Sequence, residues 1–311
     1  MNDRLVLTII TPVYNCENYV RETIESVLNS KILFPYEFIV INDGSNDSSM
    51  KIIEEFKGLI KIYSHANVGE SLTVNRGLNA AKGEFVLVLN ADDPLLTPDL
   101  INYSCKYLLD NSNIDAVYPD WKVIDENGVT LRVNILPNYS DEIFIGRNRC
   151  LPGPGTIFRR NIALKIGGRS PRWKFVGDYD FWLRFSKIGS IERIPGVLAQ
   201  WRENSNSTSV SSRGFEMANE RINVINNFLE TNKVSPKLAR KAVANSYYLA
   251  ARLGFFDSSI NSRKLLIKSF KHRRGWPEEA KLHVVIYLLL LPISNNMFNS
   301  MPSALKKVLL R

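Results

Sequence analysis

Cysteine is scarce in this chain, and its few cysteines form no motif. The 311 residues include three, Cys16, Cys105 and Cys150, and no two of them show the Cys-x-x-Cys spacing of zinc and redox sites. An odd number of widely spaced cysteines also argues against a disulfide framework. The composition therefore disfavours a small disulfide-stabilised secreted fold and favours a reducing compartment.

The chain also lacks a hydrophobic run of membrane-spanning length. Its apolar run Val284–Leu291 is far shorter than the roughly 20 residues that a spanning helix needs. Two interpretations of this run stay open, a buried core helix and an interfacial helix flanked by basic residues. The first apolar run, Leu5–Ile10, meets Pro12 at once, which is typical of a strand and atypical of a signal peptide. We expect no secretion and a cytoplasmic location.

Negative charge is scarce only in the last third of the chain. Residues 213–311 carry 17 Lys and Arg against 6 Asp and Glu, whereas residues 1–212 carry 23 against 25. A basic segment attracts anionic membranes and nucleic acids without sequence specificity. This one lacks the interleaved aromatic residues with which proteins bind single strands. The pattern allows peripheral contact with the anionic inner face of the cell membrane, and we expect no nucleic acid partner.

The first part of the chain alternates apolar strand patterns with helix patterns. The third helix pattern runs from about Glu70 to Ala81 and ends at Gly83, a candidate C-terminal cap. Ser45, Asn46 and Asp47 are candidate N-terminal caps for the second helix pattern, which follows them. Such an order predicts an α/β fold with a parallel sheet, whose carboxyl edge collects the loops that follow the strands. The predicted strands are Leu5–Thr11, Glu37–Ile41, Ile60–Tyr63 and Phe85–Leu89.

From Arg213 onward the pattern becomes helical. Ile222, Ile225 and Leu229 form one amphipathic stripe, and Ser235 followed by Pro236 is typical of a helix start. Asp257 or Ser258 is a candidate cap for a third helix, and Asn204–Ser212 is a Ser/Asn-rich loop or linker. We therefore predict two domains, residues 1–212 and a basic α-helical domain of residues 213–311.

The fourth predicted strand ends abruptly in polar residues, Asn90-Ala91-Asp92-Asp93. Carboxylate and amide oxygens are ligands for hard divalent cations, and such a cation in turn binds a diphosphate. The alternative is an ordinary polar turn closed by Pro94. The order and spacing of other motifs favour the first interpretation.

Together these motifs resemble the family 2 glycosyltransferases of the GT-A fold, over about residues 4–210. The resemblance implies a GT-A type, Rossmann-like nucleotide-sugar-binding domain. It also implies an inverting enzyme that transfers one sugar from a nucleotide-diphosphate sugar to a hydroxyl of a glycan or lipid-linked acceptor in cell-surface polysaccharide biosynthesis. The default donor is a UDP-sugar. The motifs are Thr11-Pro12-Val13-Tyr14-Asn15, Asn42-Asp43-Gly44-Ser45, Asn67-Val68-Gly69, Asn75-Arg76-Gly77, Ala81-Lys82-Gly83-Glu84, Phe158-Arg159-Arg160, Ile166-Gly167-Gly168 and Gly177-Asp178-Tyr179-Asp180.

The resemblance also assigns roles to single residues. The cofactor is a divalent cation, Mn²⁺ or Mg²⁺, held by Asp92 with Asn90. Asp178 is the catalytic base, and Gly155, Thr156 and Trp182 lie on the acceptor side. Asp178 as a mere helix cap is the alternative, and we assign Asp180 to the helix dipole. Donor-binding residues are Pro12, Tyr14, Asp43, Asn75, Ala91 and Asp92, with Pro12, Tyr14 and Asp43 lining the nucleotide pocket.

The chain departs from the family pattern at several positions. Asn90 replaces the first Asp of an Asp-x-Asp motif, which removes a charge from the cation site, and Gly177 replaces a Glu before the base. Val74 stands where many relatives carry an arginine, and whether Arg76 compensates stays open. Gln200-Trp201-Arg202 is similar to the QxxRW signature of processive relatives, but its spacing differs, which favours a non-processive enzyme.

A second function class stays open beside the transferase. The chain could be a nucleotide- or nucleic-acid-binding protein, including a transferase that has lost its activity. The retention of both Asp92 and Asp178 argues against such a loss.

Overall fold

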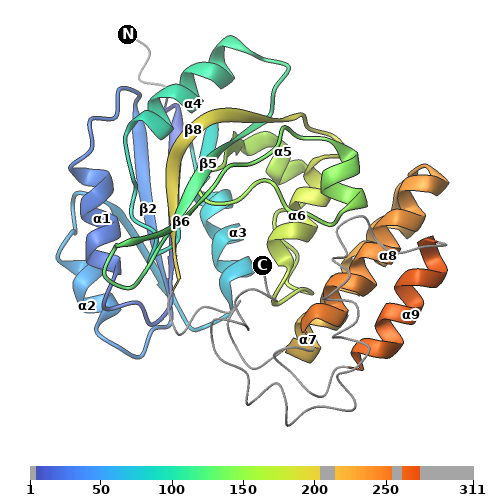
Figure 1. Cartoon of the computed structure of the whole chain (residues 1–311). Helices are drawn as coiled ribbons and strands as arrows, with labels where there is room; N and C mark the ends of the chain where they lie inside the picture. The colour runs from blue at the N-terminus through green and yellow to red at the C-terminus, as the bar shows by residue number, and fades with distance from the viewer. Residues whose placement is uncertain (1–4, 204–213, 254–260, 274–311) are drawn as a thin grey trace. The chain divides into compact units, whose positions relative to one another are not determined.

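The computed structural model describes residues 5–203, 214–253 and 261–273. They form two compact units (Figure 1). The first comprises the described residues up to Tyr139 and those from Cys150 to Glu203, and the second comprises Ser140–Arg149 and the described residues from Gly214 onward. The predicted division after residue 212 stays a prediction, and the structure adds that Ser140–Arg149 packs with the C-terminal helices.

The first unit is built on a mixed sheet whose N-terminal strands are parallel. The strand order is β3-β2-β1-β4-β7-β5-β6, and β8 pairs with β5. β1 pairs in parallel with β2 and β4, and β2 with β3, whereas β7 runs antiparallel to both of its neighbours. The predicted α/β architecture is confirmed. The strands are β1 (Leu7–Val13), β2 (Tyr36–Asp43), β3 (Lys61–His65), β4 (Phe85–Val88), β5 (Ala116–Ile124), β6 (Thr130–Asn134), β7 (Ile157–Arg159) and β8 (Ile191–Arg202).

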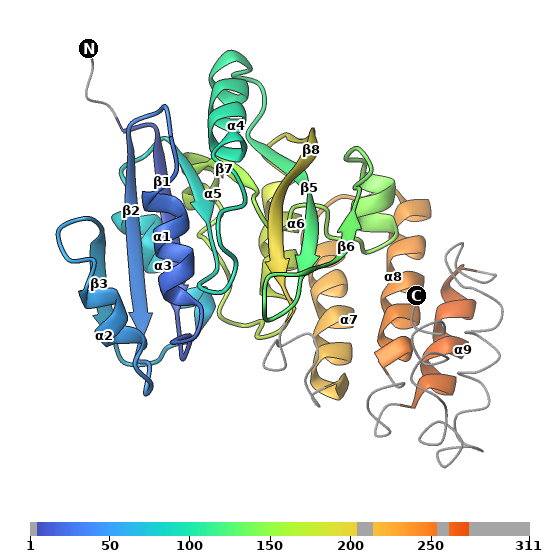
Figure 2. The same ribbon diagram turned by 60° about the vertical axis from the view of Figure 1, so that its left-hand side comes forward.

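Helices cover both faces of this sheet (Figure 2). α1 (Val20–Leu28), α2 (Ser49–Glu54) and α4 (Asp99–Asp110) share a buried core with alternate residues of β1, β2 and β4. α3 (Glu70–Ala80), α5 (Arg160–Lys165) and α6 (Gly177–Phe185) lie on the opposite face. Because both faces are buried, the central strands read as continuous apolar runs instead of alternating ones.

The prediction that Gly83 caps α3 was wrong. α3 ends at Ala80, and its C-terminal cap is Ala81 with an extended backbone, so Gly83 caps nothing. A Cβ on Gly83 would lie 2.5 Å from the backbone carbon of Leu7 and from the nitrogen of Thr8. Glycine is needed there because the chain passes directly over β1.

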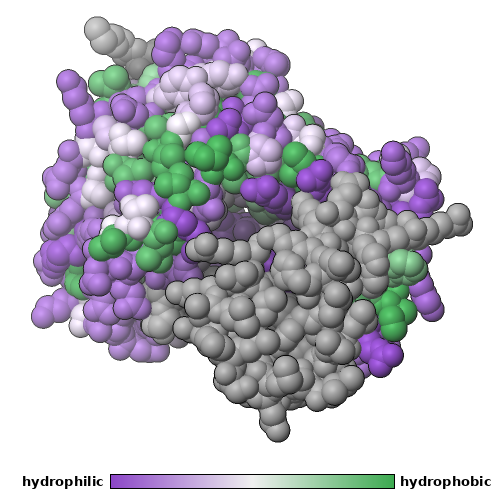
Figure 3. Space-filling view, viewed as in Figure 1, coloured by the Kyte–Doolittle hydropathy of each residue, from purple (hydrophilic) through white to green (hydrophobic). Residues whose placement is uncertain are grey.

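β6 is an edge strand with an exposed apolar face. Its sequence alternates polar and apolar residues, a pattern typical of a half-buried strand. Hydrophobic surface gathers in Figure 3 around the place where Figure 1 draws β6. The alternation on this strand therefore does not mark a buried face. The exposed side chains are Leu131 (52%) and Val133 (51%) on β6, with Val129 (60%) directly before the strand and Ile135 (63%) directly after it.

A buried carboxylate ties the start of β2 to its neighbours. Glu37 is 6% exposed and accepts hydrogen bonds from the Thr8 hydroxyl at 2.7 Å, Lys61 Nζ at 2.5 Å and the Lys82 amide at 2.5 Å. Burial alone would raise the pKa of Glu37, but the hydrogen bonds outweigh it and hold that pKa below its usual value.

Glu37→Gln should therefore destabilise the protein by roughly 1–3 kcal/mol at pH 7. A lowered folded-state pKa adds stability above the unfolded-state pKa of about 4.3, and this contribution is lost as the pH falls through the folded-state value. The difference in stability between wild type and Glu37→Gln, measured by urea unfolding, should therefore be smaller at about pH 3.5 than at pH 7. Glu54→Gln, an exposed change on α2, is the control and should cost little at either pH. Equal stability of Glu37→Gln and wild type at pH 7 would contradict this reading.

The second unit consists of helices and one short π-helical turn. α7 (Gly214–Thr231), α8 (Pro236–Arg252) and α9 (Ser262–Arg273) follow the turn η1 (Glu142–Gly146) in sequence. The Ser235 hydroxyl caps α8 by accepting from Leu238 N, as its sequence predicts. The amide of Asn245 donates to the Gly146 carbonyl at 2.6 Å, and Lys241 pairs with Glu142. These bonds hold η1 against α8.

Some predictions fall outside the described residues. They concern the linker Asn204–Ser212, the caps Asp257 and Ser258, and the apolar run Val284–Leu291. Among the residues that the structure does describe, no helix combines the length and the hydropathy needed to cross a bilayer.

Candidate functional site

The loops after β1 and β2 are joined by reciprocal hydrogen bonds. Asn15 N donates to the Ser45 hydroxyl at 3.0 Å, and Asn46 N donates back to the Asn15 side chain at 2.8 Å. Cys16 N donates to the Ser49 hydroxyl at 2.8 Å. Of the predicted nucleotide-binding residues, Pro12 is partly buried near the end of β1, and Tyr14, which is 50% exposed, lies in the loop that follows. The bonds fix one loop relative to the other and leave the Tyr14 ring at the surface.

Asp43 joins the second loop to the third. Its carboxylate accepts from Val68 N at 2.7 Å and Gly69 N at 3.0 Å, and His65 Nδ1 lies 3.3 Å from its Oδ1. The following Gly44 has φ +68°, and a Cβ there would lie 2.5 Å from Asn67 N. The close approach of the two loops accounts for the Asp-Gly pair, and the role of Asp43 toward a nucleotide stays a prediction.

Asn75 holds the backbone of a distant loop. Its side-chain nitrogen donates to the Arg169 carbonyl at 2.7 Å, and its oxygen accepts from Arg169 N at 2.7 Å. A Cβ on Gly168 would lie 2.3 Å from that oxygen, so glycine is required beside it. The contact attaches the Ile166-Gly167-Gly168 motif to α3. Donor binding by Asn75 stays a prediction.

Asn90, Ala91, Asp92 and Asp93 form a tight turn after β4. Asn90 Nδ2 donates to Asp93 Oδ2 at 2.9 Å, and the Ala91 carbonyl accepts from the Thr23 hydroxyl at 2.9 Å. Asp93 is 2% exposed, and its burial, with the neighbouring Asp92 charge, raises the pKa of Asp93 to about 8. Asp92 is only partly buried. Of the two carboxylates, Asp92 is the one placed to meet a ligand.

The donor atoms of this turn fit a divalent cation that shares its coordination with a substrate. The Asn90 amide nitrogen is bonded to Asp93, which leaves the amide oxygen free of that bond for a ligand. No group of three or more His, Cys, Asp or Glu side chains with metal-binding spacing occurs in the described ranges. Cations such as Mg²⁺ are commonly bound through one or two carboxylates plus substrate phosphates. The residues present match that mode.

Arg202, at the end of β8, holds the turn in place. Its guanidinium donates to the carbonyls of Asp92 at 2.9 Å and Glu126 at 2.9 Å and to Glu22 Oε2 at 2.6 Å. Its backbone N–H donates to Asp93 Oδ1 at 2.7 Å. The residue is 1% exposed. Its role in the site was not predicted from the sequence, where it stands as the arginine after Gln200-Trp201.

Arg202→Lys should therefore damage both folding and function. Lysine keeps the charge but cannot serve partners in several directions, and each buried carbonyl left without its hydrogen bond typically costs about 1–3 kcal/mol. We expect a lower melting temperature and a higher cation concentration for half-maximal activity. Arg132→Lys, at an exposed pair with Glu203, is the matched control and should change neither. An unchanged cation requirement in Arg202→Lys would show that Arg202 does not position this turn for a cation.

Asp178 lies in the first turn of α6, at the same edge of the sheet. A Cβ on the preceding Gly177 would lie 3.3 Å from the Ser71 hydroxyl, so α6 begins beside the start of α3. Asp178 is exposed and accepts from Tyr179 N at 2.7 Å. Asp180, in contrast, is buried and paired with Arg184 at 2.7 Å. The exposed acid can meet an acceptor and the buried one cannot.

The three predicted acceptor-side residues are all engaged in packing. Thr156 is buried, and its hydroxyl donates to the Gly153 carbonyl at 2.7 Å. Trp182 is 6% exposed and packs edge-on against Phe158 at a centroid distance of 5.5 Å. A Cβ on Gly155 would lie 2.6 Å from that of Ala199. These contacts account for the three residue types, and their role toward an acceptor stays a prediction.

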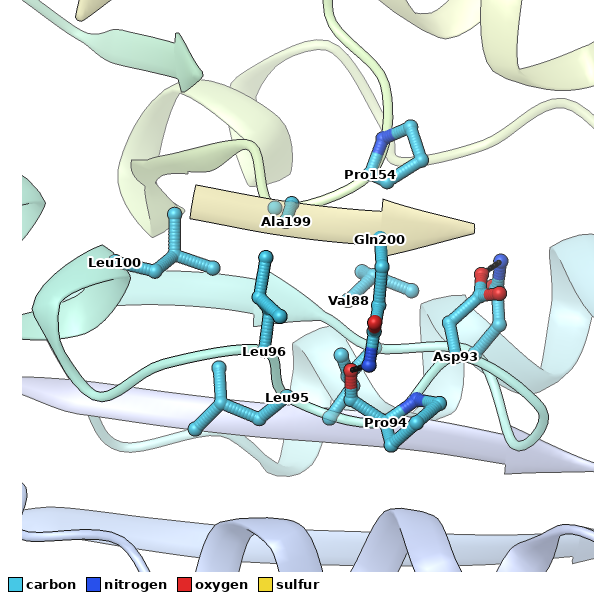
Figure 4. A pocket seen from close by; sticks show the side chains of 12 residues that line it. Val88, Asp93, Pro94, Leu95, Leu96, Leu100, Pro154, Ala199 and Gln200 are labelled. Carbon is cyan, nitrogen blue, oxygen red and sulfur yellow. Dashed lines mark hydrogen bonds between the residues drawn. The ribbon is translucent and has the colours of Figure 1, made fainter. Parts of the chain in front are cut away.

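A small cavity of about 20 Å³ lies between the Asn90–Asp93 turn and the loop before β7. Figure 4 shows Pro154 and Ala199 on one side and Pro94 and Leu96 on the other. Gln200 Nε2 closes it by donating to the Pro94 carbonyl at 2.9 Å. The cavity is too small for a sugar, and the loop before β7 packs here against the segment that follows the Asn90–Asp93 turn.

Val74 and Arg76, the positions on α3 that concern the arginine of relatives, have different surroundings. Val74 is 1% exposed and belongs to the core. Arg76 lines a separate pocket with residues of β2 and β3, and none of the predicted donor-binding residues line that pocket. The structure gives no contact through which Arg76 replaces the arginine of relatives.

The parallel half-sheet with polar loops gathered at its carboxyl edge defines a GT-A type α/β protein. The profile of the family "Glycosyl transferase family 2" matches residues 8–166, and the chain belongs to this family. The match runs from β1 through β7 and contains every predicted donor and cation residue. The protein is a glycosyltransferase.

Named relatives and solved structures agree with this assignment. An uncharacterized glycosyltransferase of Rickettsia typhi is 31% identical over 212 residues, which cover 66% of each chain. The minor teichoic acid biosynthesis protein GgaA of Bacillus subtilis is 34% identical over 215 residues, 63% of this chain and 46% of GgaA.

Among solved structures, S. aureus TarS 1–349 with UDP-GlcNAc superposes with a TM-score of 0.64 at 15% identity, covering 87% of this chain and 90% of TarS 1–349. The mannosyltransferase PcManGT of Pyrobaculum calidifontis, in complex with GDP-Man and Mn²⁺, has a TM-score of 0.57 at 14% identity, covering 99% and 84%. These likenesses show the fold.

Proposed function

We propose that this protein is an inverting glycosyltransferase that moves one sugar from a nucleotide-diphosphate sugar to a hydroxyl of a glycan or lipid-linked acceptor. The observation that carries the proposal is the placement of Asp92 and Asp178. Asp92 is partly exposed and follows β4 at the carboxyl edge of the sheet. Asp178 is exposed and lies in the first turn of α6, which begins beside the start of α3 at that edge. Ligands of open α/β sheets bind at that edge.

Each residue has a distinct task in the proposed reaction. Pro12, Tyr14 and Asp43 hold the nucleotide, a role supported by the hydrogen bonds that join the ends of β1 and β2 and the loops that follow them. Asp92 and Asn90 hold a divalent cation, Mn²⁺ or Mg²⁺, which when bound neutralises the departing diphosphate. Asp178 accepts the proton of the acceptor hydroxyl as that oxygen attacks the anomeric carbon and the bond to the diphosphate breaks. Attack from the opposite face inverts the anomeric centre.

The donor and the pathway are proposed from the relatives. One structural neighbour was solved with UDP-GlcNAc and another with GDP-Man, and the UDP-sugar remains the default. Relatives named for chondroitin, hyaluronan and minor teichoic acid synthesis support a role in cell-surface polysaccharide synthesis.

The stereochemistry of the product tests this function. The protein would be incubated with an α-linked nucleotide sugar and an acceptor, and the new linkage would be read by proton NMR. The proposal predicts a single added sugar in the β configuration. A product that keeps the α configuration, or a polymer of many added sugars, would refute an inverting, non-processive mechanism.

The basic C-terminal region supports a second, separate part of the proposal, peripheral attachment to an anionic membrane. Full-length protein should sediment with vesicles rich in phosphatidylglycerol at low salt and be released as salt rises, because each nearby Lys or Arg contributes about 1 kcal/mol before screening. Vesicles of pure phosphatidylcholine are the control and should bind little. Binding that ignores both lipid charge and salt would rule out this electrostatic attachment.

A further inference from the structure

The pocket that contains Arg76 lies between the edge strand β3 and α3. It has a volume of about 390 Å³, within the range of small-molecule sites. β3 is the last strand of the sheet on its side. Ile41 and Tyr63 are register partners on neighbouring parallel strands and therefore face the same side. The lining residues are Ile41, Tyr63, Ser64, His65, Arg76, Asn79 and Ala80.

The charge of this pocket is of one sign. Arg76 is the cation among its lining residues, and none of them is a carboxylate. Arg76 is exposed, and its guanidinium forms no hydrogen bond or ion pair with the described part of the chain. A guanidinium carries five donors in a fork that matches phosphate and carboxylate oxygens. The pocket therefore offers an unused anion-binding group.

His65 supplies a second unused group. Its Nδ1 lies 2.9 Å from the Ala66 carbonyl and 3.3 Å from Asp43 Oδ1, so this nitrogen faces two acceptors and carries a proton. Its Nε2 is buried and has no hydrogen-bond partner. A buried polar atom without a partner costs free energy that a ligand can recover. The monoanion of a phosphate monoester, which predominates below about pH 6, suits it, because its one P–OH can donate and its other oxygens can accept.

The rest of the lining suits an uncharged body attached to that phosphate. Ile41 and Ala80 are apolar, and the Tyr63 ring is 46% exposed. Within the described ranges, Tyr63 and Asn79 form no side-chain hydrogen bond. The site thus combines an apolar floor, a ring and several donors around one guanidinium.

We propose that this pocket is a second ligand site, which binds a small phosphorylated molecule through Arg76 and His65. It is separate from the predicted donor site, whose residues do not line it. His65 connects the two, because the same ring faces the pocket and contacts Asp43. The coupling to donor binding rests on the proposed function of Asp43, whereas the existence of the site does not. By linkage, the ligand and the nucleotide must change each other's affinity by the same factor.

Histidine NMR tests the site directly, because the chain has only three histidines. Full-length protein labelled with ¹⁵N-histidine would be titrated with phenyl phosphate, inorganic phosphate and, for comparison, benzoate. We expect a saturable shift of the His65 signals with phenyl phosphate and a weaker response to the other two. Arg76→Gln should weaken the affinity at least 10-fold, whereas Arg21→Gln, an exposed arginine on α1 across the sheet, should leave it unchanged.

Repeating the titration with saturating UDP and Mn²⁺ separates the possible failures. The proposal predicts that phenyl phosphate still binds. UDP should change the affinity for phenyl phosphate by the same factor by which phenyl phosphate changes the affinity for UDP. Full displacement by UDP would place the ligand in the donor site and overturn the second site. A shift that is absent, non-saturable or equal in Arg76→Gln would also overturn it. None of these results bears on whether the protein transfers sugar, which is measured by product formation alone.

Discussion

Asp178→Asn should lower the rate of sugar transfer by roughly 10²- to 10⁴-fold, the usual range for loss of a general base. The amide has nearly the same shape as the carboxylate but cannot take the acceptor proton. It can still accept the hydrogen bond from Tyr179 N, so the start of α6 should keep its stability. Donor affinity, measured by calorimetry with UDP and Mn²⁺, should stay nearly unchanged. The acidic limb of the pH–rate profile should disappear in parallel.

The matched control is Asp99→Asn. Asp99 is also an exposed acid in the first turn of its helix, α4, and the structure gives it no part in the site. It should transfer sugar at the wild-type rate. If Asp178→Asn folds, binds donor and transfers as fast as this control, Asp178 is a helix-terminal residue only and the base lies elsewhere.

Asp92→Ala should abolish transfer. Asn90 supplies no charge, and Asp93 is buried within the turn and accepts hydrogen bonds from Asn90 and Arg202, so Asp92 is the main anionic ligand available to a cation. Asn90→Ala removes one neutral oxygen, and its activity should be partial and should recover as Mn²⁺ is raised. Initial rates over a range of Mn²⁺ concentrations distinguish the two variants.

Donor binding gives an independent measurement of the same turn. Asp92→Ala should weaken UDP binding in Mn²⁺ but not in EDTA, since only the cation-mediated part of the affinity is lost. Asp110→Ala, at the exposed end of α4, controls for the loss of a surface carboxylate. If Asp92→Ala transferred sugar at the wild-type rate, the assignment of a cation to this turn would be wrong.

The sequence was most informative where one physical constraint dominates. Phe85–Leu89 and Glu37–Ile41 read as buried strands because both faces of the central sheet are covered, and parallel strands then placed their polar ends on one edge. The location of the Asn90-Ala91-Asp92 turn followed from that geometry alone. Ser235 was identified as a cap because its hydroxyl bonds locally, three residues along the chain.

The features that the sequence did not reveal depend on contacts between distant segments. Arg202 reaches back 110 residues to the Asp92 carbonyl, and no local pattern encodes that distance. Gly83 looked like a helix cap but is required by the passage of the chain over β1. Ser140–Arg149 packs with helices some 100 residues later through single bonds such as that from Asn245 to Gly146. Periodicity reports the buried face of one element and not the identity of its partner.

The most direct test of the account measures nucleotide diphosphate release from a panel of UDP-, GDP- and dTDP-sugars, with and without Mn²⁺, in the presence of an acceptor mixture. The account predicts release from one or a few of these donors, dependent on both the cation and the acceptor, and almost none from Asp178→Asn or Asp92→Ala. Equal release by wild type and both variants, or no release from any donor by a folded wild type, would contradict it.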